Sequence, residues 1–433
     1  MRDSSTRPFA FIDIHLCDPA QSIDGTHTVL VADGRIRAVE HHVAPSLLEA
    51  DYDLIDGKGL TMLPGLVDSS VRTGEPGHEH EETLASASAA AVSGGVTTMI
   101  VKPETQPVID DIALVEFILR NAAATAVNRV HVMGALTKDL AGEEMSELRL
   151  MHDAGAPAFT NGRRSITNSS LMRRALSYAK DFGAIIVHHT DDRSLSGDGV
   201  MNEGEMASRL GLPGIPKESE IIMLERDLRL AALTDGRYHA AAISCAESVE
   251  LIARAKKAGL DVTAGASINN LTLNETDIGA YRTFFKLSPP LRLEEDRRAV
   301  VDAVANGTID IVHSDHEPRD VDHKRHPFAD AADGAIGLET FLPALMRLVH
   351  SEELSLMEAI RSVTANPASR FGLEAGSLSK GMPADFVTVD FDHPWVLTED
   401  ALRSRSKNTV FEGARFSGRV LSTYIGGREV FRS

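Results

Sequence analysis

The sequence contains few cysteines and few aromatic residues. Cys17 and Cys245 are its only cysteines among 433 residues, which excludes a disulfide framework and favours a reducing, cytoplasmic setting. Aromatic residues make up 5% of the chain, so the core must consist mainly of aliphatic side chains. No apolar run approaches the roughly 20 residues that cross a bilayer, and we do not expect residues 1–5 to open a signal peptide.

Blocks of basic residues are also missing. The chain has 44 Lys and Arg against 63 Asp and Glu, a net charge of −19, so we expect no nucleic-acid or membrane partner. Its length is large for one compact core and fits a barrel of about 250 residues plus a smaller module.

The order of expected elements indicates an α/β protein. Residues 1–63 read as β, with a hairpin over residues 28–39 that turns at Asp33-Gly34. Strands and helices then alternate, which predicts a parallel (β/α)8 TIM barrel over residues 64–375 with its functional face at the strand ends. Residues 376–433 return to β and turn at Gly426-Gly427. We expect both chain ends to form one small β-sandwich. The eight barrel strands are expected at 65–68, 97–101, 129–133, 158–159, 184–187, 238–244, 261–264 and 309–313.

Several motifs resemble those of dihydroorotases of the long bacterial type, in the amidohydrolase superfamily. Residues 65–77 keep the frame of the family's Gly-Leu-Val-Asp-x-His-x-His-x-Arg-x-Pro-Gly, residues 94–98 match Gly-Gly-x-Thr-Thr, and residues 289–292 match Pro-Pro-Leu-Arg. The stretches 201–204, 211–216, 337–340 and 406–413 match as well. The resemblance covers nearly the whole chain and implies a hydrolase fold for cyclic amides in pyrimidine biosynthesis.

The resemblance also implies zinc ligands, and most of them are replaced here. Ser70 and Arg72 stand at the paired histidines after the first strand. The other replaced ligand positions are Asn161 for an aspartate, Ala242 for a histidine and Arg319 for the last histidine of Thr-Asp-His-x-Pro-His. His189 and Asp315 remain as residual ligands, and His316 is kept beside Asp315. A catalytic zinc usually has three protein ligands, so we expect no metal and no catalytic residue; if the chain is active, Asp315 moves the proton.

The family's substrate-binding positions are changed too. Gly74 replaces an arginine and Glu104 replaces an asparagine. Asn269-Asn270 replaces a pair of histidines, and Ser288 replaces the asparagine before Pro-Pro-Leu-Arg. With the carboxylate of Glu104 present and no arginine at position 74, the pocket is poorly suited to an anionic dihydroorotate.

Three functions follow from these residues. The first is a non-catalytic dihydroorotase homologue, which by resemblance acts as structural partner of aspartate carbamoyltransferase and forms a homodimer. The second is a divergent cyclic-amide hydrolase, dihydroorotase-like or hydantoinase-like, with a rebuilt one-metal zinc site around His189, Asp315 and His316. The third is a ligand sensor whose barrel mouth is made basic by three arginines and invites an anion: Arg72, Arg163 and Arg319.

Plainer interpretations compete at single residues. His189 is expected to bond Asp191 or backbone, and Arg72 either faces Asp315 across the mouth or is solvated. Residues 78–82 (His-Glu-His-Glu-Glu) are expected to form a solvated helix start. Cys245 is interpreted as a buried filler rather than a reactive thiol.

Overall fold

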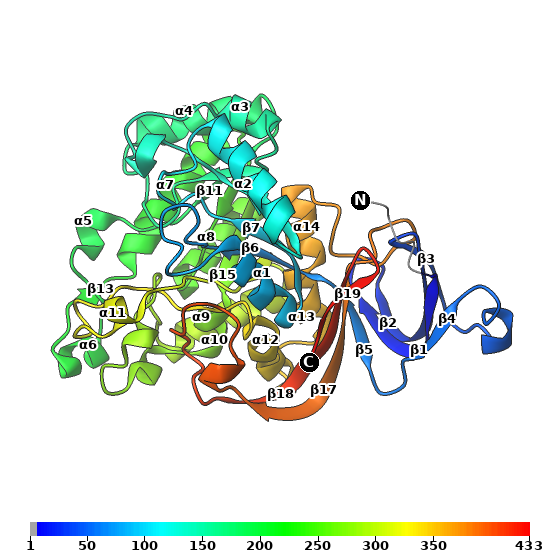
Figure 1. The fold of residues 1–433 in the computed structure, drawn as a ribbon. Coiled ribbons are helices and arrows are strands. Elements are labelled where there is room, and N and C mark those ends of the chain that lie inside the picture. The colour runs from blue at the N-terminus through cyan, green and yellow to red at the C-terminus, as the bar shows by residue number, and fades with distance from the viewer. Residues whose placement is uncertain (1–6) are drawn as a thin grey trace.

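The computed structural model describes residues 7–433, so the expectation about residues 1–5 lies outside it. Figure 1 shows a large part of alternating strands and helices beside a smaller, β-rich part. Helices α13 (Leu356–Val363) and α14 (Ala365–Phe371) lie between the two. No helix among residues 7–433 is both long and apolar enough to cross a bilayer.

The β-rich part is built from both ends of the chain, as predicted. Its strands follow the order β19-β18-β17-β5-β1-β2-β3, and β4 pairs with β1. Antiparallel pairing of β17 with β5, from Phe386 opposite Pro64, joins the C-terminal to the N-terminal segment. Positive φ angles at Asp33 and Gly34 confirm the hairpin turn between β2 and β3. The strands are β1 (Phe9–Asp18), β2 (Ile23–Ala32), β3 (Arg35–Glu40), β4 (Asp53–Asp56), β5 (Thr61–Pro64), β17 (Phe386–Val396), β18 (Arg415–Ile425) and β19 (Arg428–Arg432).

The larger part contains the eight expected parallel strands, in two sheets. One sheet has the order β6-β7-β8, and the other has the order β16-β15-β14-β11-β10-β9. Hydrogen bonds from His316 N to Ser70 O and from Arg72 N to His316 O link the two at one side. On the other side β8 runs directly into β9, and no continuous ladder closes a ring within residues 7–433. The strands are β6 (Leu66–Val71), β7 (Val96–Val101), β8 (Arg129–Val132), β9 (Gly134–Ala135), β10 (Ala158–Thr160), β11 (Ile185–His188), β14 (Tyr238–Ala240), β15 (Val262–Ser267) and β16 (Ile311–His313).

Helices connect these strands, and one begins later than expected. Helix α1 starts at Leu84 because Thr83 caps it, with a reciprocal bond between Thr83 and Ser86. Residues 78–82 therefore form a turn before the helix, and Glu81 and Glu82 are buried rather than solvated. The helices before α13 are α1 (Leu84–Ser93), α2 (Ile112–Thr125), α3 (Leu148–Asp153), α4 (Ser169–Lys180), α5 (Arg193–Ser196), α6 (Glu205–Leu210), α7 (Glu218–Thr234), α8 (Ala246–Lys257), α9 (Ile268–Thr272), α10 (Glu294–Ala305), α11 (Val321–Lys324) and α12 (Phe341–His350). A short pair of parallel strands, β12 (Met201–Asn202) and β13 (Gly214–Ile215), lies between α5 and α7.

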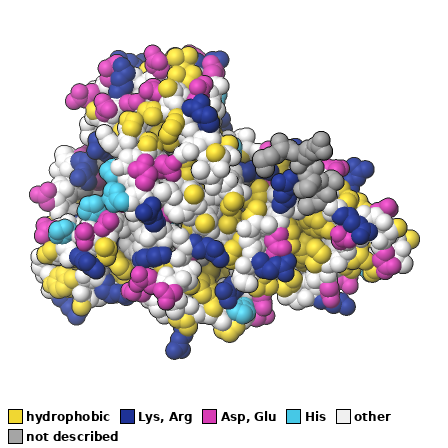
Figure 2. Space-filling model, in the orientation of Figure 1, with side chains coloured by type: hydrophobic (Ala, Val, Ile, Leu, Met, Phe, Trp, Pro, Cys, Tyr) yellow, Lys and Arg dark blue, Asp and Glu magenta, His cyan; other side chains and the backbone are white. Residues whose placement is uncertain are grey.

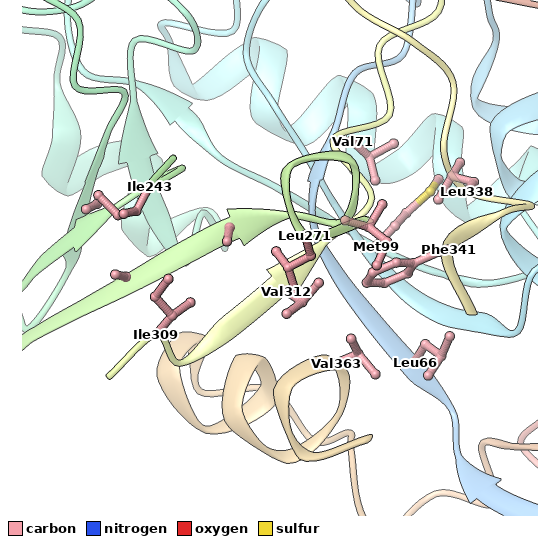
Figure 3. Close-up of a cluster of buried hydrophobic side chains, with 14 of the residues drawn as sticks. Leu66, Val71, Met99, Ile243, Leu271, Ile309, Val312, Leu338, Phe341 and Val363 are labelled. Carbon is pink, nitrogen blue, oxygen red and sulfur yellow. The ribbon is translucent and has the colours of Figure 1, made fainter. Parts of the chain in front are cut away.

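The main core is aliphatic, as the low aromatic content predicts. In Figure 3, Leu66 and Met99 from β6 and β7 lie near Val312 from β16, Phe341 from α12 and Val363 from α13. All five side chains are fully buried. Figure 2 shows acidic and basic side chains interspersed over the visible face, while hydrophobic side chains gather in places between them. The strands are thus held from outside by helices, which leaves their carboxyl ends free to carry polar residues.

The approach of β6 to β7 gives a test of the fold. A β-carbon on Gly65 would lie 2.0 Å from Thr97 Oγ1 and 2.6 Å from Thr97 Cβ. Gly65→Ala should therefore lower the free energy of unfolding by about 1–3 kcal/mol in urea titrations, because the strands must separate. Gly25→Ala is the matched control, since its β-carbon meets only His27 Cε1 at 4.0 Å. Equal stability of the two variants would contradict this packing.

Candidate functional site

Polar side chains meet at the carboxyl ends of the parallel strands. Ser70 lies in β6, Lys102 follows β7, Arg163 follows β10, His189 follows β11 and Asp315 follows β16. These five residues help to line a cavity of about 40 Å³. A space of that size holds ordered water at most. The predicted site residues are therefore brought together, but the space among them is nearly filled.

A buried carboxylate, Glu317, is the centre of this region. Its side chain is fully buried, and four cationic groups surround it. The distances to its oxygens are 3.1 Å from Lys102 Nζ, 3.1 Å from Arg319 Nη2, 3.3 Å from Arg72 Nε and 3.3 Å from Arg163 Nε. We call the set the Glu317 cluster, with the acidic partners of these cations included: Glu81, Glu104, Asp315 and Asp333.

Asp315, the residual metal ligand of the family pattern, is held inside this cluster. Its Oδ2 lies 2.8 Å from Arg163 Nη2, and its Oδ1 accepts a 3.2 Å hydrogen bond from Ser70 Oγ. Lys102 Nζ lies 3.8 Å from the same Oδ1. Both carboxylate oxygens therefore already have partners, and a positive charge approaches each.

Arg72 does not face Asp315, contrary to one of the expectations. It donates from Nη1 to Glu81 at 2.7 Å and to the Pro318 carbonyl at 3.1 Å, and it is 6% exposed. Asp315 instead takes its cation from Arg163. The reason is that Glu81 is drawn inward by the turn before α1, which supplies a nearer carboxylate for Arg72.

The arginines do not make the mouth basic, so the cluster offers no excess charge to an anion. Four cations face five carboxylates in the Glu317 cluster. Burial alone would raise the pKa of the Glu317 carboxyl, but the charges of Lys102, Arg319 and Arg163 hold that pKa well below its usual range. The same competition lowers the pKa of Asp315, again chiefly through Arg163 and Lys102.

His189 is the second residual ligand, and its ring is also engaged. Its Nε2 lies 3.2 Å from Ser288 Oγ, rather than against Asp191 as expected. Burial lowers the pKa of His189 to about 4, only partly opposed by the charge of Asp191. The ring is therefore neutral at physiological pH.

Two further histidines near the strand ends have structural contacts. His313 Nε2 lies 2.9 Å from the Ala241 carbonyl, and burial lowers the pKa of the His313 ring. His316 is fully buried, and its Nδ1 accepts a 3.2 Å hydrogen bond from Gly337 N. No group of three His, Cys, Asp or Glu residues within 7–433 is placed to hold a metal ion. With Asp315 bound by Arg163 and with Lys102 beside it, these residues do not fit a zinc ion.

The altered substrate positions have their own local contacts. A β-carbon on Gly74 would lie 1.9 Å from the His78 carbonyl oxygen, so an arginine has no room there. Glu104 accepts from Arg163 N at 3.0 Å, Asn161 accepts from Thr137 N at 3.0 Å, and Asn270 donates to the Pro290 carbonyl at 3.0 Å. Glu104, Asn161 and Asn270 are thus bonded to protein, whereas the buried side-chain amide of Asn269 has no hydrogen-bond partner among residues 7–433. Ala242 contributes only an apolar wall to the small cavity.

Sequence reasoning missed four members of the Glu317 cluster. Lys102, Glu317 and Asp333 have no predicted role, and Glu81 is expected only in a solvated helix start. Glu317 nevertheless stands inside the stretch matched to Thr-Asp-His-x-Pro-His, and Lys102 stands two residues before Glu104. Lys102 directly follows the strand expected at residues 97–101, and Glu317 lies shortly after the strand expected at residues 309–313. Charges beside the expected strand ends were the available signal.

Cys245 is a filler, in agreement with the plainer interpretation. Its side chain is fully buried, and burial together with the charge of Glu220 raises the pKa of the thiol above its usual range. A thiol held in its neutral form is a poor nucleophile.

Comparison with known proteins matches this scaffold to one family. The chain matches the family model "Dihydro-orotase-like" over residues 59–248 and the model "Amidohydrolase family" over residues 338–431. It is 40% identical to the dihydroorotase of Anaeromyxobacter dehalogenans strain 2CP-1, over 95% of each chain. It is also 40% identical to the dihydroorotase of Syntrophotalea carbinolica, over 96% of this chain and 97% of that one.

Solved structures share the fold. The L-hydantoinase (dihydropyrimidinase) from Arthrobacter aurescens superposes with a TM-score of 0.87 at 24% identity, over 98% of this chain and 96% of that one. The dihydropyrimidinase from Brevibacillus agri NCHU1002 superposes with a TM-score of 0.81 at 21% identity, over 98% of this chain and 95% of that one. The α/β fold is therefore that of the hydantoinases. Because its identity to dihydroorotases extends over almost the entire chain, this protein belongs to the dihydroorotase family of the amidohydrolase superfamily.

Proposed function

We propose that this chain is a dihydroorotase-like protein of pyrimidine biosynthesis that has lost catalysis and serves as a structural partner of aspartate carbamoyltransferase. The observation that carries the proposal is the Glu317 cluster. Cations and their carboxylate partners occupy the strand ends at which the family pattern has metal ligands. We further propose a cytoplasmic homodimer and a closed (β/α)8 barrel made of the two sheets.

The chemistry of the reaction supports this proposal. Zinc lowers the pKa of bound water from about 15.7 to about 7, a difference that corresponds to roughly 12 kcal/mol. Of the remaining groups, Asp315 accepts protons only weakly because Arg163 holds its pKa low. His189 is neutral and bonded to Ser288. None of these side chains supplies an equivalent nucleophile for attack on an amide.

The preserved scaffold supports a role in assembly. Glycines at closely packed positions, such as Gly65 against the Thr97 side chain and Gly94 against the Leu338 backbone, are present, and so is the buried aliphatic core. Loss of activity without loss of the fold is the pattern expected when shape and surface are what the cell uses. A structural partner needs both, whereas it needs no metal.

A divergent one-metal hydrolase is the second candidate. The observation that favours it is that His189, His313 and Asp315 line one cavity. A metal there would first have to displace Arg163 from Asp315 and Ser288 from His189, each of which is within hydrogen-bond distance.

Metal content and turnover test the proposal directly. Protein purified with zinc present should contain less than about a tenth of a metal ion per chain, because a catalytic site uses three protein ligands. It should not hydrolyse dihydroorotate. Elemental analysis and a spectrophotometric assay measure both, with the Anaeromyxobacter dehalogenans dihydroorotase as positive control. Stoichiometric metal that disappears in His189→Ala would support the divergent hydrolase instead.

The Glu317 cluster should contribute strongly to stability. Glu317→Gln leaves four cations near a neutral amide, which should cost about 3–5 kcal/mol of unfolding free energy at pH 7. Because the folded-state pKa of Glu317 is lowered, its contribution is complete above the unfolded pKa and is lost as pH falls through the folded value. Urea titrations should therefore show the gap between variant and wild type narrowing as the solution is acidified below about pH 4.

Asp68→Asn is the matched control for this prediction. Asp68 is fully buried near the same strand ends, but burial raises its pKa, and its Oδ1 accepts from the backbone N–H groups of Ser70 and Ser314. An asparagine oxygen can accept the same bonds, so we expect a loss below about 1 kcal/mol. If Glu317→Gln lowered the free energy of unfolding as little as this control, the Glu317 cluster would not contribute strongly to stability.

Association with aspartate carbamoyltransferase is tested with the enzyme of the same organism. Sedimentation velocity of the two purified proteins at micromolar concentration should show a species larger than either alone. Each protein alone gives the reference. Two unchanged boundaries in the mixture would remove the partnership from the proposal.

A further inference from the structure

A second hollow lies on the β-rich side of the chain. It has a volume of about 630 Å³ and lies between the end of α12 and the outer half of the β17–β18 hairpin. We call it the Trp395 groove. Its lining residues are Arg347, His350, Ser351, Pro394, Trp395, Val396, Arg415, Phe416 and Ser417. None of them is acidic, in a chain whose net charge is −19, and none lines the cavity among the strand ends.

The aromatic wall of this groove is fixed in place. Trp395 and Phe416 face each other across the hairpin with ring centroids 5.3 Å apart. The Trp395 indole N–H donates to the Gly418 carbonyl at 2.9 Å. The Arg347 guanidinium lies 4.4 Å above the Phe416 ring, in cation–π contact. Val396 beside them is 50% exposed, so an apolar surface is open to a partner. Because Trp395 and Phe416 are already held in place, binding would restrict their side chains little further.

The cations of the groove have no carboxylate partners. Arg347 is half-buried and donates to the Arg415 carbonyl at 3.1 Å. Across residues 7–433, no carboxylate oxygen lies within 4.0 Å of a guanidinium nitrogen of Arg347 or Arg415. Burial lowers the pKa of Arg347, and the charge of Asp277 opposes this effect only in part. The contrast with the Glu317 cluster is direct, because every cation there has an acidic partner.

We propose that the Trp395 groove docks an acidic segment of a protein partner, in which glutamate or aspartate stands beside an apolar or aromatic residue. Charge complementarity selects the acidic residues, which Arg347 and Arg415 receive. The apolar neighbour packs on Trp395, Phe416 and Val396. Tryptophan and arginine are the residue types that dominate binding energy in protein interfaces. The proposal does not depend on whether the strand ends bind metal.

The chain offers an internal reporter for this site. Trp395 is its only tryptophan, so tryptophan emission, excited at a wavelength where the 5 tyrosines absorb little, reports on the groove alone. The intact protein is titrated with a synthetic peptide that alternates glutamate with phenylalanine and glycine. We expect a saturable change in Trp395 fluorescence, with an affinity that weakens as salt is added.

Two charge reversals provide the matched comparison. Arg415→Glu should weaken peptide binding about tenfold or more, while circular dichroism remains unchanged because its side chain is exposed. Arg254→Glu makes the same change of charge on the exposed face of α8 and should leave binding unaltered.

Four results would overturn the proposal. They are no saturable fluorescence change, equal binding by Arg415→Glu, equal binding of a peptide with lysine in place of glutamate, and the same response to free glutamate at equal concentration. Sedimentation velocity of the protein without peptide tests for a fifth contradicting result. Self-association that shifts Trp395 fluorescence and is abolished by Arg415→Glu would assign the groove to a second copy of this chain.

Discussion

The strand ends of this protein depend on one buried carboxylate. Glu317 is fully buried and lies between 3.1 and 3.3 Å from a nitrogen of each of four cations. Isolated charges in so dry a place cost several kcal/mol each. Arg72 and Lys102 are tolerated there because Glu317 neutralises them, and Glu317 is tolerated because they surround it. Each of these charges can therefore stay buried only because the opposite charges lie beside it.

This interdependence bears on the proposed loss of the metal centre, because the charged residues at the strand ends depend on one another. Restoring a histidine at position 72 would remove the arginine that pairs with Glu81 and one of the four cations around Glu317, while Arg163 would still hold Asp315. A metal ion would also meet the charge of Lys102, whose pKa is raised by Glu317 and Glu104 despite the opposing effect of burial. Under the proposed loss of the metal centre, the substitutions are therefore coupled, and changing one residue back would not rebuild a metal site.

Much of the fold could be predicted from the sequence, because its signals are local. Turn pairs such as Asp33-Gly34 and Gly426-Gly427 marked turns that the structure contains. The eight strands were found from their alternation with helices, whereas the division of these strands into two sheets and the start of α1 depend on contacts and caps that periodicity does not contain. At the site, the loss of ligands could be read residue by residue. The ion pairs among these residues could not be predicted from the sequence. Arg163 and Asp315 are separated by 152 positions, and several carboxylates were possible partners for Arg72.

Charge compensation also distinguishes the two polar regions of the molecule. In the Glu317 cluster the cations and carboxylates are buried together and neutralise each other, so this region is stable without a ligand. In the Trp395 groove, by contrast, Arg347 and Arg415 form no ion pair with a carboxylate of residues 7–433, and Asp277 acts on Arg347 only from beyond 4.0 Å. Water and counterions screen these charges in the free protein. An acidic partner would gain from complementarity with the two arginines, in a chain that has 63 acidic residues elsewhere.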